Sequence, residues 1–90
     1  MPLFALICTD KADLLHIRTA NRDAHLAYLR ASGVVSQAGP FLDPDGTMCG
    51  SLVVLDVPDR AAAEGWAAAD PYAMAELFAK VRIEEWRKVI

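Results

Sequence analysis

Residues 50–57 have the sequence Gly50-Ser51-Leu52-Val53-Val54-Leu55-Asp56-Val57, which predicts a β-strand. The leucines and valines of this stretch fall on both of its alternating faces. A strand that is apolar on both faces needs cover on both, as the inner strands of a packed sheet have. Residues 2–9 show the same two-sided apolar pattern. We therefore expect residues 2–9 and 50–57 to form two central strands.

Two shorter segments predict the edges of the same sheet. Residues 34–38 mix valines with a serine and a glutamine, and residues 79–85 alternate apolar with charged side chains. Half-exposed patterns of this kind are typical of edge strands. The segment over residues 40–46 is expected to be a loop, because Asp43-Pro44-Asp45-Gly46 has the composition of a turn.

Apolar residues recur at helical spacing in the segments that separate these strands. The first predicted helix covers residues 11–32 and ends at the glycine that follows, a residue suited to a helix stop. The second covers residues 59–69 and begins with an aspartate cap. A short third helix is expected over residues 70–77, with Asp70 as its cap and Pro71 as its first helical residue.

The order strand–helix–strand–strand–helix–strand predicts one α+β domain over residues 1–90. Right-handed crossovers turn this order into a split βαβ arrangement, a four-stranded antiparallel sheet with both helices on one face. The other face still carries apolar side chains, and 54% of the residues are hydrophobic, more than one small core needs. A second copy of the sheet is the cover that we expect, so we predict a homodimer joined through the sheet faces.

Charge and composition argue against several partners. The net charge is −3 and no basic block is present, so we expect no nucleic-acid binding. No apolar run is long enough to span a membrane and the N-terminus lacks the pattern of a signal peptide, so we expect a cytoplasmic protein. Cys8 and Cys49 end one central strand and begin the other, and we expect them to lie near each other as reduced thiols. With only His16 and His25 in addition, we expect no metal site.

Short motifs are spread along nearly the whole chain. An Arg-x-x-His lies on the first helix, a Gly-Pro follows the second strand, and an Asp-Pro-Tyr follows the second helix. The stretches concerned are Asn21-Arg22-Asp23-Ala24-His25-Leu26-Ala27-Tyr28-Leu29, Ala38-Gly39-Pro40, Gly50-Ser51-Leu52-Val53-Val54, Trp66-Ala67-Ala68-Ala69-Asp70-Pro71-Tyr72, and Val81-Arg82-Ile83 with Trp86. In this order and at these separations, they resemble the YCII-related (YciI-like) family.

The resemblance implies a ferredoxin-like fold and dimers of the α+β barrel type, which agrees with the architecture expected from the residues. Family members carry a histidine and an aspartate proposed as an active-site pair, and these correspond to His25 and Asp70. The resemblance includes a dehydrochlorinase of chlorinated hydroquinones, and the wider superfamily holds muconolactone isomerases and small monooxygenases. It therefore implies chemistry on small cyclic or aromatic molecules. The glycine that often follows the Asp-Pro-aromatic stretch is absent, and Ala75 lies near that place.

His25 is the main candidate for proton transfer, because a free imidazole titrates at about pH 6.5. Asp70 would fix its tautomer and stabilise the imidazolium. Each residue also has a purely structural interpretation, His25 as a half-buried helix residue bonded to a backbone carbonyl and Asp70 as a helix cap. The two roles of Asp70 are compatible, because a cap uses only one of the carboxylate oxygens.

Five further residues are candidates for substrate binding. Arg22 lies one helical turn before the histidine and is either a site for an anionic substrate or a solvated surface arginine. Ser51 would donate a hydrogen bond to substrate or to a neighbouring strand, and no nucleophile elbow surrounds it. Gly39 and Pro40 are expected to shape the rim of the pocket. Tyr72 either lines the pocket or packs over the first helix.

The expected topology separates His25 from Asp70 unless the first helix is interrupted. A helix of about 20 residues is about 30 Å long, whereas a strand of about seven residues covers only about 23 Å. Thr19 and Asn21 are both good helix caps. We therefore expect a break at residues 19–21 that places His25 in the first turn of the main helix, unless the partner subunit supplies the carboxylate.

Three interpretations of the function follow. The first is an enzyme that acts on a small polar or cyclic molecule by proton transfer, elimination, isomerisation or hydrolysis, without metal or organic cofactor. His25 would be its general acid and base and Asp70 its orienting residue. The second is a non-catalytic dimeric module that binds a metabolite or a partner domain through the same cleft. The third is a dimeric scaffold with a satisfied polar pair and no site.

Overall fold

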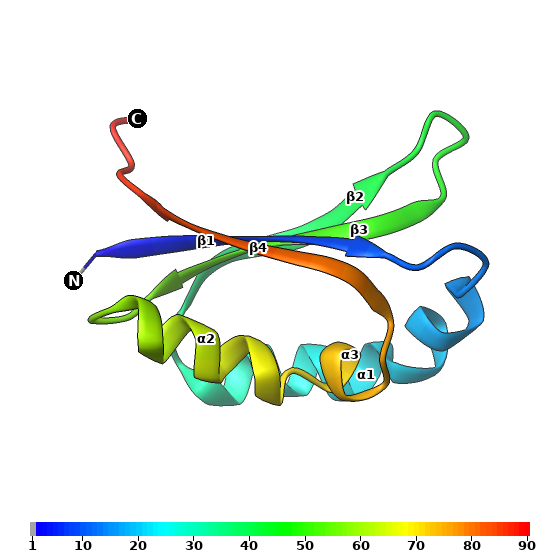
Figure 1. The fold of residues 1–90 in the computed structure, drawn as a ribbon, viewed down its shortest axis with the longest axis horizontal. Helices are drawn as coiled ribbons and strands as arrows, with labels where there is room; N and C mark the ends of the chain where they lie inside the picture. The colour runs from blue at the N-terminus through cyan, green and yellow to red at the C-terminus, as the bar shows by residue number, and fades with distance from the viewer. Residues whose placement is uncertain (1) are drawn as a thin grey trace.

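The computed structural model describes residues 2–90 and has the expected order of elements (Figure 1). The strands are β1 (Leu3–Asp10), β2 (Val35–Leu42), β3 (Met48–Asp56) and β4 (Phe78–Trp86), and the helices are α1 (Leu15–Ser32), α2 (Arg60–Ala69) and α3 (Pro71–Met74). The sheet is antiparallel with the order β2-β3-β1-β4, so β1 and β3 are central, as predicted. No helix within residues 2–90 has both the length and the apolar character needed to cross a bilayer.

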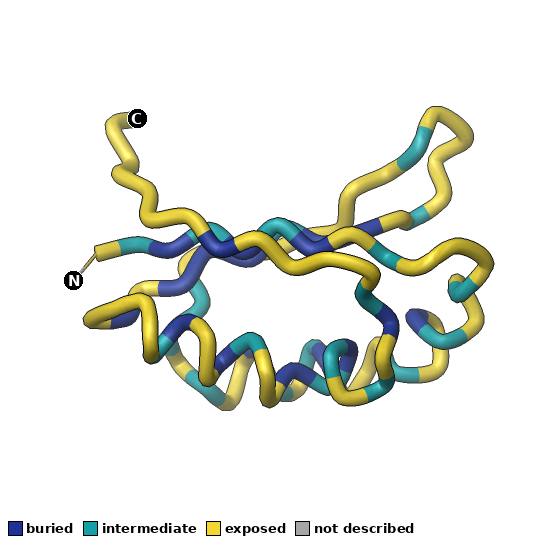
Figure 2. Tube along the Cα trace, in the orientation of Figure 1, coloured by how far each residue is buried: buried dark blue, intermediate teal, exposed yellow. Residues whose placement is uncertain are grey.

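The core lies between the sheet and the helices, which cover only one face of the sheet (Figure 1). Figure 2 shows the buried positions gathered along this layer. One alternating set of apolar side chains from the central strands packs there, together with residues of β4, α1 and α2. The buried residues of this cluster are Phe4, Leu6, Cys8, Leu29, Val53, Leu55, Val57, Ala63, Trp66 and Ile83. One of the two apolar faces of β1 and β3 therefore contributes its side chains to the core.

The other half of those side chains points away from the helices. Ala5 and Ile7 of β1 lie opposite Val54 and Leu52 of β3, and Leu3 precedes them on the same face. Val54 is only 2% exposed and yet lies outside the core cluster. Within residues 2–90, no helix covers this side of the sheet (Figure 1). We call the surface formed by these five residues the outer face.

The β2–β3 hairpin is longer than predicted. β2 was expected to end at residue 38 but continues to Leu42, and Pro40 lies within it opposite Ser51. An edge strand tolerates proline because one side of its backbone needs no partner for hydrogen bonding. The turn is confined to the residues after Leu42, where Oδ1 of Asp43 accepts hydrogen bonds from two backbone N–H groups and Gly46 has a positive φ.

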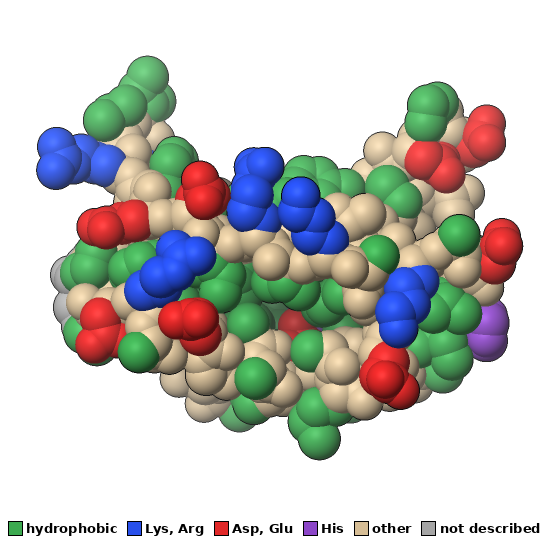
Figure 3. Space-filling view, in the orientation of Figure 1, with side chains coloured by type: hydrophobic (Ala, Val, Ile, Leu, Met, Phe, Trp, Pro, Cys, Tyr) green, Lys and Arg blue, Asp and Glu red, His purple; other side chains and the backbone are tan. Residues whose placement is uncertain are grey.

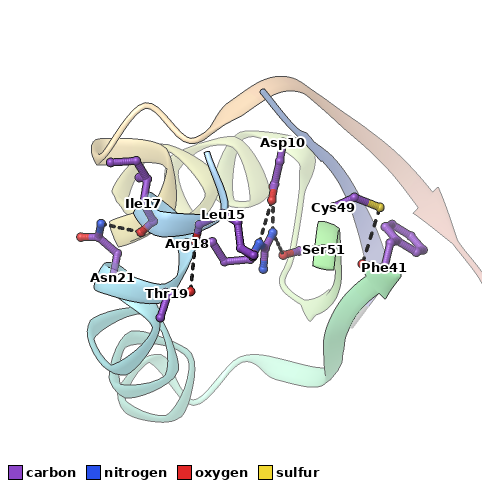
Figure 4. Close-up of polar contacts among 9 residues, drawn as sticks. All are labelled: Asp10, Leu15, Ile17, Arg18, Thr19, Asn21, Phe41, Cys49 and Ser51. Carbon is purple, nitrogen blue, oxygen red and sulfur yellow. Dashed lines mark hydrogen bonds and ion pairs between the residues drawn. The ribbon is translucent and has the colours of Figure 1, made fainter. Parts of the chain in front are cut away.

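The predicted break in the first helix is wrong. α1 begins at Leu15, later than expected, and continues without interruption to Ser32. The hydroxyl of Thr19 donates to the carbonyl oxygen of Leu15 at 3.0 Å, and the side-chain amide of Asn21 donates to that of Ile17 at 2.9 Å (Figure 4). Both side chains thus bond back to the preceding helical turn instead of capping a new helix.

Two lengths explain why no break is needed. β1 and β3 have 8 and 9 residues, more than the seven used in the length comparison, so the 18-residue helix α1, about 27 Å long, matches the sheet. α2 has only 10 residues and is about 15 Å long. It therefore ends beside the middle of α1, where it delivers Asp70 to His25. The prediction failed because it assumed that both helices run the full length of the sheet.

The end of α3 places a glutamate in the left-handed region. Glu76 has φ 58°, and its N–H donates to the carbonyl of Ala73 at 3.0 Å. The N–H of Leu77 donates to the carbonyl of Tyr72 at 3.1 Å. These two bonds form a Schellman motif, in which the left-handed position is usually glycine. The position that favours glycine is therefore Glu76, and not Ala75, whose φ is −82°.

We expect Glu76→Gly to stabilise the protein by about 1 kcal/mol. The left-handed conformation costs an L-residue roughly 1–2 kcal/mol, and the greater chain entropy of glycine offsets part of this gain. In a thermal melt, the midpoint should rise by roughly 4–8 °C. The matched control is Glu64→Gly at an exposed position inside α2, which should lower stability by about 1 kcal/mol. A midpoint for E76G at or below that of the natural chain would show that the left-handed conformation of Glu76 costs no stability.

Candidate functional site

His25 and Asp70 meet within one chain. His25 lies on α1, and Asp70 lies between α2 and α3. Nδ1 of His25 and Oδ1 of Asp70 are 2.7 Å apart, and their side chains are only 7% and 3% exposed. Because a carboxylate only accepts hydrogen bonds, Nδ1 of His25 carries the proton of this bond. This tautomer leaves Nε2 free as a base.

Asp70 and Tyr72 hold the histidine in one orientation. Oδ1 of Asp70 also accepts the backbone N–H of Tyr72 at 3.0 Å, which caps α3. The cap was predicted, but both hydrogen bonds use the same carboxylate oxygen and not one oxygen each. The rings of His25 and Tyr72 are stacked, with centroids 3.9 Å apart and planes 13° from parallel. Asp70 thus fixes the tautomer while Tyr72 fixes the plane of the ring.

A second buried polar cluster lies beside this pair. Nε and Nη2 of Arg18 donate to the two carboxylate oxygens of Asp10 at 2.7 and 2.8 Å (Figure 4). Nη2 also donates to Oγ of Ser51 at 2.9 Å, and Cζ of Arg18 lies 4.7 Å from the ring centroid of Tyr72. Burial by itself lowers the pKa of Arg18, but the hydrogen bond and charge of Asp10 raise it above its ordinary value. The guanidinium therefore stays charged inside the protein.

Both clusters open onto one cavity of about 220 Å³. Its walls come from α1, α3 and the β2–β3 hairpin. The lining residues are Arg18, Arg22, His25, Leu26, Leu29, Ala38, Gly39, Pro40, Met48, Ser51, Val53 and Tyr72. An apolar cavity of about 150 Å³ is large enough for a benzene ring. The volume here therefore suits a molecule with a single ring and a few substituents.

The structure brings the predicted site residues together around this cavity. Arg22, Gly39, Pro40, Ser51 and Tyr72 line it together with the histidine, and the aspartate lies behind the histidine. Gly39 and Pro40 are part of β2 and not of a loop. The side chain of Arg22 is exposed, and no carboxylate among residues 2–90 forms an ion pair with it. The roles of these five lining residues in substrate binding stay predictions.

Arg18 and Asp10 are the polar residues that the sequence did not indicate. Arg18 is 2% exposed, whereas an arginine in a helix is normally expected at the surface. One signal was present, because residues 18, 22 and 25 are spaced to share one face of a helix. Asp10, at the end of a central strand, is the acid that compensates the buried charge.

Cys8 and Tyr72 stay protonated near this site. Burial, reinforced by the charge of Asp70, raises the pKa of Cys8 to about 12. Burial also raises the pKa of Tyr72, although Arg18 opposes the shift. Cys8 is therefore a neutral thiol and no nucleophile at physiological pH. Cys49 is an exposed thiol, and the two cysteines are not bonded to each other.

A larger groove of about 710 Å³ lies where the start of β1 meets the end of β4. Its lining residues are Pro2, Leu3, Glu85, Trp86, Arg87 and Lys88. The residues described there include no histidine and no buried polar cluster, so this groove lacks the oriented histidine–carboxylate pair of the smaller cavity. Within residues 2–90, no three histidine, cysteine or acidic side chains gather as a metal-binding group.

Several curated and solved proteins are similar to this chain. Protein YciI of Escherichia coli is 34% identical over 96 residues, covering 97% of this chain and 98% of that protein. An uncharacterized protein of Haemophilus influenzae is 32% identical over 95 residues, covering 96% and 97%. The structure of a 5-chloro-2-hydroxyhydroquinone dehydrochlorinase from Burkholderia phenoliruptrix, in complex with 2,5-dihydroxybenzoquinone, has a TM-score of 0.86 and 30% identity, covering 94% of this chain and 93% of that one.

More distant structures share the fold alone. An antibiotic biosynthesis monooxygenase superposes with a TM-score of 0.62 over the whole of both chains but is only 14% identical. These neighbours place the fold in the ferredoxin-like dimeric α+β barrel superfamily. The sequence pattern of the YCII-related domain matches residues 2–87. Together with the relatives named YciI, this match shows that the chain belongs to the YCII-related domain family.

Proposed function

We propose that this protein is a small-molecule enzyme that uses His25 and Asp70 for general acid–base chemistry. The observation that carries the proposal is the buried 2.7 Å hydrogen bond between the two side chains beside a cavity of about 220 Å³. A histidine oriented by a carboxylate is a common arrangement for proton transfer near neutral pH. A base facing a cavity also favours an active site over a polar pair that merely completes a core.

The substrate class that we favour is a hydroxylated six-membered ring. The similar dehydrochlorinase acts on 5-chloro-2-hydroxyhydroquinone and was solved with 2,5-dihydroxybenzoquinone, both single rings that suit the volume of this cavity. In an elimination of this kind, the carbon that carries chlorine first gains a proton while one hydroxyl group of the ring becomes a carbonyl. His25 then takes the proton of a second hydroxyl group, and the electron pair left on that oxygen passes through the ring and expels chloride. The histidine returns its proton to solvent, so that the net loss is hydrogen chloride and the product is a quinone.

Arg22 would add charge recognition to this site. Its exposed guanidinium lines the cavity and has no ion-pair partner among residues 2–90, so it is available to an anionic oxygen of a substrate. Gly39 and Pro40, in the extended β2 strand, would form the opposite wall. Tyr72, stacked on the imidazole, would keep the base in place during turnover.

The proposal is tested by incubating the protein with 5-chloro-2-hydroxyhydroquinone and measuring chloride release. Binding of 2,5-dihydroxybenzoquinone is measured in parallel by calorimetry. We expect catalytic chloride release and binding of one ligand per chain. Binding without turnover would instead support the non-catalytic metabolite-binding module. The absence of both would rule out hydroxylated rings as the substrate class.

We also propose that two copies join through the outer face. Its five apolar residues lie on central strands, and Val54 at its centre already excludes water. Figure 3 shows hydrophobic side chains on the two arms that rise at either end of this face, the C-terminal segment and the β2–β3 hairpin. The exposed apolar residues of these arms include Phe41, Leu42, Val89 and Ile90. The sheet of a second copy, placed between the two arms, would cover the outer face and the apolar side chains of both arms.

Light scattering should give a mass twice the 9.8 kDa of one chain. We expect Leu52→Glu to halve this mass, because it places a charge in the middle of the joined sheets. The matched control is Ala61→Glu, an exposed position on α2 on the opposite side of the molecule, which should stay dimeric. A monomeric mass for the natural chain in this measurement would contradict the proposed dimer.

A further inference from the structure

The hydroxyl of Ser51 accepts a hydrogen bond but donates none. Its Oγ accepts from Nη2 of Arg18 at 2.9 Å, and no acceptor within residues 2–90 takes its proton. Ser32 shows the ordinary arrangement, because its hydroxyl donates to the carbonyl of Leu29 and accepts from Nε1 of Trp66, each at 3.1 Å. Ser51 is only 3% exposed and lines the cavity. The hydroxyl proton of Ser51 is therefore available to a molecule bound in the cavity.

Asp10 prevents Arg18 from turning away from the serine. Two parallel hydrogen bonds of 2.7 and 2.8 Å hold the guanidinium against the carboxylate, in the bidentate geometry that fixes an arginine most firmly (Figure 4). The donation from this cation occupies a lone pair of Ser51, so the serine's own O–H must point elsewhere. Donation from a charged group also polarises the hydroxyl and makes it a stronger donor.

Ser51 is not arranged as a nucleophile. No hydrogen bond joins its Oγ to the imidazole of His25, the only described base beside the cavity. The nearby charge is positive, and it opposes loss of electron density from the oxygen during attack on a substrate. The same charge favours a negative oxygen placed on the other side of the hydroxyl.

From this geometry we propose that Asp10 and Arg18 position Ser51 as a hydrogen-bond donor to an oxygen atom of the substrate. The site then selects molecules that carry a carbonyl or deprotonated hydroxyl oxygen opposite the group that His25 deprotonates. When His25 takes a proton from the substrate, the electron pair left behind spreads onto that oxygen, which Ser51 stabilises. No bond to the protein forms. The inference rests on the proposed function and deepens it by naming what the substrate must carry.

The test compares Ser51→Ala with the matched control Ser32→Ala, using 2,5-dihydroxybenzoquinone as the probe. A hydrogen bond to a charged oxygen is worth roughly 1.5–3 kcal/mol, so the dissociation constant of S51A should rise about 10- to 100-fold. Ser51→Cys, which keeps a weaker donor, should fall between S51A and the natural chain. S32A should bind the probe normally, because its hydroxyl lies away from the cavity lining. Circular dichroism establishes that all variants are folded.

Asp10→Asn tests the positioning role of the pair. The amide keeps a hydrogen bond to Arg18 but removes the charge, and we expect KM for oxygen-bearing substrate to rise more than kcat falls. Probe binding by S51A as tight as that of the natural chain would overturn the inference alone. Failure of the natural chain to bind the probe would overturn the inference together with the proposed substrate class.

Discussion

Replacing His25 with glutamine is expected to lower turnover by about 10²- to 10⁴-fold, the usual contribution of a positioned general base. Glutamine retains a polar side chain of similar size, so Asp70 keeps a hydrogen-bonding partner within the buried pair. Because the loss falls on the chemical step, kcat should drop while KM for the substrate changes little. Steady-state chloride release from 5-chloro-2-hydroxyhydroquinone measures both constants.

His16→Gln is the matched control for this variant. It replaces the chain's other histidine with the same residue at an exposed position of the same helix, and turnover should not change. Equal turnover by H25Q and the natural chain would remove His25 from the mechanism.

Asp70→Asn separates the two tasks of the aspartate. Asparagine caps a helix about as well as aspartate, so α3 should form normally and stability should change little. The negative charge that stabilises the imidazolium is lost, and we expect kcat to fall by at least about 10-fold. A thermal melt together with kcat distinguishes the cap from the orienting role. Unchanged kcat in a stable D70N protein would leave the aspartate with its structural task alone.

Arg18→Met is expected to lower the free energy of unfolding by about 3–5 kcal/mol, the typical cost of removing one partner from a buried ion pair. The side chains of Arg18 and Asp10 are only 3% and 7% exposed, so the remaining carboxylate would stay buried without its cation. Urea denaturation measures the change. A loss of this size is a large fraction of the stability of a typical small domain.

Two further variants separate charge burial from lost packing. Arg22→Met replaces the exposed arginine one helical turn away and should change stability by less than about 0.5 kcal/mol. Asp10→Asn combined with Arg18→Met removes both charges and should be more stable than R18M alone, since no charge is then left unpaired. A double variant that is less stable than R18M would show that packing around the guanidinium, and not its charge, is what matters.

Much of the fold could be predicted because its signals are local. The apolar alternation of β1 and β3 depends only on neighbouring residues, and it correctly placed both strands in the middle of the sheet. The caps at Asp59 and Asp70 and the left-handed stop at Gly33 also form as expected. The full length of β2 was harder to predict, because the residues that extend it, such as Pro40, favour a loop when considered alone.

The sequence by itself determined the order of strands and helices, the central strands and the residue types available for chemistry, because these follow from local periodicity and short motifs. Only the tertiary structure showed that α2 ends beside the middle of α1 and so brings Asp70 to His25 without a break in the helix. It alone showed that Arg18 is buried against Asp10 and Ser51. Such a contact joins a helix, a strand end and a neighbouring strand, and its energy exists only once all three have packed.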